Sequence, residues 1–125
     1  MSRPAPAATT RWCCGAPDPR RGSSSTSTTR ARGLLLAAER LETSEPVNLG
    51  TGRETTIREL AEQIERIVGY EGETVWDATR PDGQPRRFLD VARARDLMGF
   101  EARVPLDEGL RRTVESFKAT APATR

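Results

Sequence analysis

Residues 46–69, PVNLGTGRETTIRELAEQIERIVG, are the stretch of sequence that decides the fold. The first part, Pro46–Gly52, is a short apolar run ending in glycines, which predicts a strand. Thr56, with Glu59 three residues later, forms a capping box that predicts the start of a helix, and the apolar residues behind it recur with the helical period. Gly69 stands where a glycine is expected after a helix. A strand, a glycine turn and an amphipathic helix predict an α/β protein.

The elements expected on either side are also short. Glu73–Asp77 alternates and predicts a second strand, whereas the Pro and Gly content of Thr79–Arg87 predicts a loop. Further helices are expected over Ala31–Arg40, between the cap residue Asp90 and Gly99, and from Pro105 onward with Leu106, Leu110, Val114 and Phe117 facing inward. Short strands and about four helices therefore predict an α/β lobe over residues 33–119, followed by a frayed tail over 120–125.

The head of the chain differs from this body in composition. From Met1 to Gly33 there is no Leu, Ile, Val or Phe, and six Arg face one acid, Asp18. Such a segment cannot bury enough apolar surface to offset the entropy lost on ordering, so residues 1–32 are expected to be disordered. The rest of the chain is mildly acidic, with 14 Lys and Arg against 17 Asp and Glu. The net charge of +2 averages two unlike parts and predicts neither a nucleic acid nor a membrane as partner.

The sequence offers few groups for catalysis. It contains no His, and the adjacent Cys13 and Cys14 form neither a metal set nor a long-loop disulfide. Thr74 follows Tyr70 at the spacing where a Tyr-x-x-x-Lys pair needs Lys, and Thr55 stands where a G-x-G-x-x-G pattern starting at Gly50 needs its third glycine. No catalytic, cofactor-binding or metal-binding residue is therefore predicted. We see no signal peptide or apolar span, so a cytoplasmic location is expected.

The segment RPDGQPRR, residues 80–87, carries the candidate binding residues. Asp82 can accept hydrogen bonds from sugar or ribose hydroxyls, and Gly83 permits a turn with positive φ. Arg86 and Arg87 offer planar guanidinium groups to a diphosphate. On the residues alone, an exposed surface turn with two solvated arginines is the alternative.

Three segments resemble one family: EPVNLGTGRETTIRELAEQI, RPDGQPRRFLDVARARDLMGF and VPLDEGLRRTV. They are similar to the C-terminal third of the NAD(P)-dependent epimerase/dehydratase family, the extended short-chain dehydrogenases, and most of all to its GDP-L-fucose synthase branch. That branch has a strand-GTG-helix, then a Pro-Asp-Gly-x-Pro-Arg-Lys loop and Leu-Asp-Val. The resemblance covers Gly33 to about Phe117, and residues 80–91 are its most specific part.

The resemblance implies a fold, a ligand and a cofactor. The fold would be the C-terminal substrate-binding lobe, and Asp82, Arg86 and Arg87 would contact a nucleotide sugar, with a GDP-sugar favoured. Arg87 departs from the pattern, which often has Lys there. NADP or NAD would bind an upstream domain of the intact enzyme, which also carries the Tyr-x-x-x-Lys pair and is expected to be a homodimer. No cofactor is expected to bind this chain alone.

The family also offers an explanation for the head. Before the segment similar to Gly33–Glu39, it has a segment like Val-x-Leu-Trp-Gly-x-Gly-x-Pro-x-Arg-Glu-Phe-Leu-Tyr-Val-Asp-Asp. When each codon is shifted to start at its last base, Gly22–Arg30 can encode Glu-Phe-Leu-Tyr-Val-Asp-Asp-Ala, and Trp12–Gly15 can encode Val-Leu-Trp. We interpret the head as a family strand translated out of frame, with the frame restored near Arg32 or Gly33. A natural flexible Ser/Thr linker is the alternative.

Three hypotheses for function follow. The chain is the nucleotide-sugar-binding C-terminal part of an epimerase or reductase and is not competent alone. Alternatively, it is a stand-alone, non-catalytic α/β binding module. A nucleic-acid binder with a basic head is the third hypothesis, which the acidic body and the few aromatic residues disfavour.

Overall fold

The structure is a computed structural model, and it describes residues 11–14, 21–79 and 85–121. Its elements, in chain order, are β1 (Arg11–Cys14), β2 (Arg21–Gly22), α1 (Ser27–Arg40), β3 (Thr55–Thr56), α2 (Ile57–Val68), β4 (Glu73–Trp76), β5 (Arg86–Arg87), α3 (Ala92–Met98) and α4 (Leu106–Thr120). Four helices with short strands confirm the predicted α/β class.

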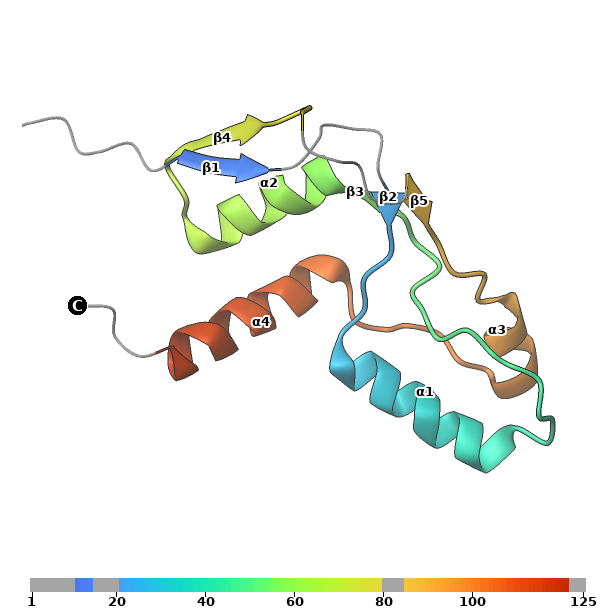
Figure 1. The fold of residues 1–125 in the computed structure, drawn as a ribbon. Helices are drawn as coiled ribbons and strands as arrows, with labels where there is room; N and C mark the ends of the chain where they lie inside the picture. The colour runs from blue at the N-terminus through green and yellow to red at the C-terminus, as the bar shows by residue number, and fades with distance from the viewer. Residues whose placement is uncertain (1–10, 15–20, 80–84, 122–125) are drawn as a thin grey trace, which may run out of the picture.

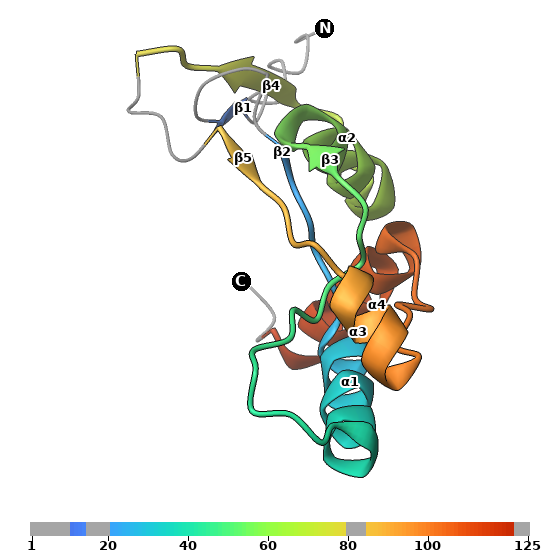
Figure 2. The ribbon, with the colours of Figure 1, turned by 90° about the vertical axis from the view of Figure 1, so that its right-hand side faces the viewer.

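The strands form two small sheets. β1 pairs in parallel with β4, Arg11 beside Glu73 and Cys14 beside Trp76. In the second sheet, β2 lies between β3, to which it is antiparallel, and β5, to which it is parallel. Figure 1 shows α2 beside the β1–β4 pair and α4 beside α2, with α1 and α3 together at the other end of the molecule. Figure 2 shows β2, β3 and β5 beside the start of α2, with α1 and α3 below them.

Helix α2 forms as its capping box predicts. The Thr56 hydroxyl accepts a hydrogen bond from the Glu59 N–H at 3.1 Å, and the Thr56 N–H donates to the Glu59 carboxylate at 2.8 Å. Gly69 ends the helix in the left-handed region, with φ of 70°. Ala61 on its inner face is buried, whereas Ile57 and Val68 at its two ends are each 42% exposed. The predicted start and end are confirmed, whereas Ala61 is the buried residue of the helix and the apolar residues at its two ends are exposed.

The main core cluster lies at the other end, between α1, α3 and the segment before the glycine turn. Ala94, Met98 and Phe100 are buried, and half-buried apolar residues of α1 and of residues 41–49 pack on them: Leu36, Ala37, Leu41, Val47 and Leu49. Gly33 lies against Leu49 and Phe100, since an added Cβ would come within 2.9 and 3.1 Å of them. This contact fixes α1 to the body at the predicted boundary.

The head needs a correction where the structure describes it. α1 begins at Ser27, with Thr26 as its N-cap, and not at Ala31 or at the expected boundary of 32 and 33. β1 and β2 also lie within the segment expected to be disordered. Backbone pairing and a hydroxyl cap explain these elements, because neither depends on aliphatic side chains. Residues 1–10 and 15–20 lie outside the described residues.

The expected strand over Pro46–Gly52 is wrong. The strand in this region is β3, and within the described part of the chain no strand pairs with residues 46–50. The run is apolar because Val47 and Leu49 pack on the α1–α3 core, so packing on helices and not membership of a sheet explains it. Glu73–Trp76 confirms the second strand, one residue shorter than predicted.

Smaller corrections concern the later elements. Residues 86 and 87, expected in a loop, form β5 because β2 supplies a partner. Pro105 is the N-cap of α4 and not a first-turn residue. Phe117, expected to face inward, is 71% exposed and lines a cleft together with Ser25–Thr28. Thr120, expected in the frayed tail, ends α4, and residues 122–125 lie outside the described residues.

Candidate functional site

The candidate binding segment lies between β4 and α3. Its carboxylate, Asp82, falls in residues 80–84, outside the described residues. The two arginines are described: Arg86 and Arg87 form β5, an edge strand of the three-stranded sheet. The Arg21 N–H donates to the Pro85 carbonyl at 3.1 Å, which ties the start of β5 to β2.

Arg86 has a partner from a distant part of the chain. Its guanidinium donates a hydrogen bond to Glu54 and forms an ion pair with it, and it also lies 5.3 Å from the centre of the Phe88 ring. The Glu54 side chain is only 21% exposed. The hydrogen bond from Arg86, helped by the charges of Arg86 and Arg21, lowers the pKa of Glu54, and the same hydrogen bond raises the pKa of Arg86. Both groups are therefore held in their charged forms.

Arg87 has different surroundings. It is exposed, and within the described part of the chain its side chain has no hydrogen bond or ion pair. Successive residues of a strand point to opposite faces, which separates it from Arg86 and Glu54. The structure therefore places the two arginines next to each other, and among the described residues Arg86 has a side-chain partner and Arg87 has none.

Sequence reasoning did not find Glu54. It stands 32 positions before Arg86, and only the pairing of β2 with both β3 and β5 brings the two together. The one local signal is an acid placed directly after the glycine turn, and that signal does not identify a partner.

The glycine turn before Glu54 has a packing role. A Cβ at Gly50 would meet Leu89 at 3.2 Å, and one at Gly52, whose φ is 65°, would meet Val91 at 2.9 Å. The Thr51 hydroxyl accepts a hydrogen bond from the Arg53 N–H at 3.3 Å. These contacts explain the two glycines as a tight turn packed on residues 89–91.

No group of three or more His, Cys, Asp or Glu that could hold a metal occurs among the residues described. None of the helices in the described ranges is both long and apolar enough to cross a membrane.

The chain is similar to known enzymes over part of its length. It is 44% identical over 87 residues to GDP-L-fucose synthase 1 of Arabidopsis thaliana, covering 70% of this chain and 27% of that protein. It is 46% identical over 81 residues to the GDP-L-fucose synthase of Escherichia coli, covering 62% of this chain and 25% of that protein. The chain thus spans about a quarter of the length of these curated relatives. No protein-family model matches it.

Solved structures share the fold more completely. A UDP-glucose 4-epimerase from Thermotoga maritima, solved with UDP-glucose, matches 90% of this chain and 36% of its own, with a TM-score of 0.81 and 31% identity. RMD from Pseudomonas aeruginosa, solved with NADPH, matches 87% of this chain and 36% of its own, with a TM-score of 0.78 and 25% identity.

These similarities and the lobe of short strands and four helices define the class. The chain belongs to the NAD(P)-dependent epimerase/dehydratase family, the extended short-chain dehydrogenases, and corresponds to its C-terminal part. Within that family, the relatives at 44–46% identity given above are GDP-L-fucose synthases.

Proposed function

We propose that this chain is the nucleotide-sugar-binding C-terminal lobe of an epimerase or reductase of the GDP-L-fucose synthase type, with a GDP-sugar as the favoured ligand. The observation that carries the proposal is the exposed guanidinium of Arg87 on β5, the last residue of the segment RPDGQPRR, which has no hydrogen bond or ion pair among the described residues. A planar guanidinium suits the oxygens of a diphosphate. Asp82 would accept hydrogen bonds from sugar hydroxyls. Arg86, the other candidate contact of the diphosphate, pairs with Glu54 on the opposite face of the strand.

The lobe would bind and orient the nucleotide sugar, and another domain of the intact enzyme would supply the catalytic groups. The 125-residue sequence contains neither a Tyr-x-x-x-Lys pair nor a complete G-x-G-x-x-G pattern. We therefore propose that the chain is not competent alone and binds no nicotinamide cofactor alone. In the intact enzyme, which we expect to be a cytoplasmic homodimer, bound NADP or NAD would exchange hydride with the sugar.

A binding experiment tests the ligand. GDP is titrated into the ¹⁵N-labelled chain, and chemical-shift changes are followed at β5 and its neighbours. Asp82→Ala and Arg87→Ala should each weaken binding roughly ten- to a hundredfold, because a charge-assisted hydrogen bond contributes about 1.5–3 kcal/mol. Asp82→Ala is tested with a GDP-sugar, and Arg87→Lys should be milder because it keeps the charge.

Arg66→Ala is the matched control, since Arg66 is exposed on α2. Unchanged binding of the ligands by folded Asp82→Ala and Arg87→Ala variants would make the loop only a surface turn. Cofactor oxidation proportional to the amount of pure chain would contradict the statement that the chain is not competent alone.

A further inference from the structure

Three charged residues lie near one another on the three-stranded sheet. Arg21 of β2 and Arg86 of β5 are paired in register, so two like charges lie on neighbouring strands. Like charges at such positions repel each other. Glu54, directly before β3, is hydrogen-bonded to Arg86 and is also within the electrostatic reach of Arg21. Its carboxylate offsets the repulsion at the edge of the sheet.

The backbone around Glu54 is held in place. The glycine turn before it packs on Val91, and the capping box after it begins α2 at Ile57. β5, in contrast, is an edge strand of only two residues. The ion pair therefore joins an anchored residue to an element with few contacts of its own.

From this geometry we infer that Glu54 is a positioning residue for Arg87. By holding Arg86 on one face of β5, Glu54 fixes the strand so that Arg87 projects from the other face. Of the two arginines, Arg87 is then the one whose guanidinium is available to a diphosphate. The inference rests on the function proposed above for this loop. Glu54 itself touches no ligand in this scheme.

The first measurement needs no ligand. In the ¹⁵N spectrum of the 125-residue chain, the Arg86 Nε–H should exchange slowly with water because it donates to Glu54. Glu54→Ala should make this exchange fast, whereas Glu54→Gln, which keeps an acceptor oxygen, should have an intermediate effect. Fast exchange in the unmodified chain would overturn the inference.

A matched control is available on α4. There the Arg112 Nε donates to Glu108 at 2.8 Å, in an exposed pair four residues apart. Glu108→Ala should speed exchange of the Arg112 Nε–H only and leave Arg86 unchanged.

The second measurement is a double-mutant cycle with GDP as the probe. Glu54→Ala should weaken GDP binding roughly three- to tenfold, within the range of coupling between neighbouring residues. In the Arg87→Ala background it should have no further effect, because its influence passes through Arg87. An equal loss in both backgrounds would show a general structural role and overturn the inference, as would unchanged binding in Glu54→Ala.

The two proposals fail in different ways. One outcome is that the unmodified chain shows no chemical-shift changes at GDP concentrations well above the dissociation constants usual for such sites. The proposed function then fails, and the positioning of Arg87 for a diphosphate is overturned with it. If the chain binds GDP and Arg87→Ala weakens binding while Glu54→Ala does not, the proposed function stands and only the inference about Glu54 is overturned.

Discussion

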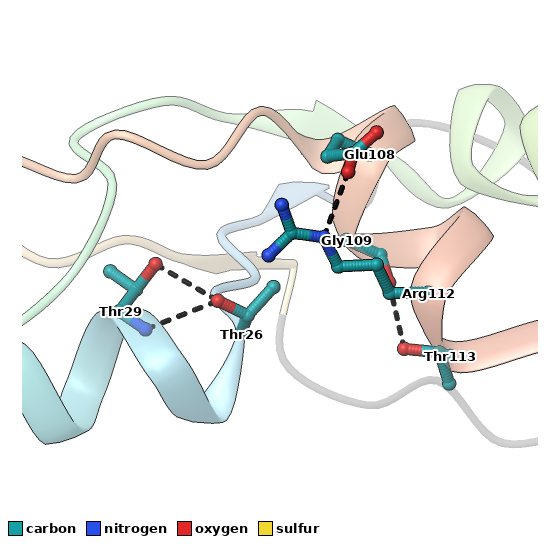
Figure 3. A network of polar contacts seen from close by, with 6 residues as sticks. All are labelled: Thr26, Thr29, Glu108, Gly109, Arg112 and Thr113. Carbon is teal, nitrogen blue, oxygen red and sulfur yellow. Dashed lines mark hydrogen bonds and ion pairs between the residues drawn. The ribbon is translucent and has the colours of Figure 1, made fainter. Parts of the chain in front are cut away.

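Gly109 shows how a single residue sets the distance between two helices. It lies in the first turn of α4, faces the N-terminus of α1, and is buried. Figure 3 shows Thr26 opposite it, with the Thr26 hydroxyl bonded to the N–H and the hydroxyl of Thr29, at 3.2 and 2.9 Å. A Cβ at position 109 would lie 2.7 Å from the Thr26 methyl group. That methyl is fixed, because the same side chain caps α1.

We therefore expect Gly109→Ala to destabilise the chain, although alanine is ordinarily the better helix former. The overlap should cost about 1–3 kcal/mol of unfolding free energy, measured by urea denaturation. Thr26→Ser keeps the capping hydroxyl and removes the methyl, so the double variant should recover most of the loss. A Gly109→Ala chain as stable as the original would show that α1 and α4 do not approach this closely.

At the scale of elements, the start of α2 should respond to pH. Hydrogen bonds from the backbone and hydroxyl of Thr56 lower the pKa of Glu59 below its ordinary value of 4.5. A carboxyl whose pKa is lower in the folded chain adds stability above its unfolded value, and this stability is lost as the pH falls through the folded pKa. Stability should therefore decline below about pH 4.5 in part through this group. Glu59→Gln should reduce the decline while it keeps an acceptor for the cap.

The measurement is urea unfolding between pH 7 and pH 3, with the original chain and the Glu59→Gln variant compared. Glu62→Gln, an exposed change on the same helix, is the control and should leave the pH dependence unchanged. The same slope for Glu59→Gln and the original chain would mean that folding does not lower the pKa of Glu59.

The elements that could be predicted are those with local causes. The ends of α2 follow from Thr56, Glu59 and Gly69, which all lie within or next to the helix. β3 and β5 could not be predicted, because each has two residues and exists only through β2, far away in sequence. The candidate site divides in the same way. The segment RPDGQPRR identified the arginines, but the partner of Arg86 depends on the pairing of strands.

At the scale of the molecule, the described chain buries few apolar side chains. Its buried hydrophobic residues are Ala61, Ala94, Met98 and Phe100. Two clefts border the hydroxyl-rich segment that leads into α1. A cleft of about 580 Å³ includes Ser24 and the start of α4, and one of about 550 Å³ lies between Ser25–Thr28 and the outer face of α4 with Phe117. This segment passes between the helices at a position where large side chains could fill both spaces.

The frameshift hypothesis predicts what belongs there. The other frame can encode Glu-Phe-Leu-Tyr-Val from the bases of Gly22–Ser27, and the Phe, Leu, Tyr and Val side chains would replace hydroxyls beside both clefts. To restore the frame, one base is inserted before the end of codon 12 and one base is removed near codon 32. The resulting gene encodes a restored chain of the same length as the present one. Because a fully buried side chain of this kind contributes roughly 1.5–3 kcal/mol, the restored chain should have a clearly higher unfolding free energy and melting temperature. A chain with the same apolar residues in reversed order is the control and should gain less. If the restored chain is no more stable than the present one, the segment is a natural Ser/Thr linker and the clefts are ordinary surface.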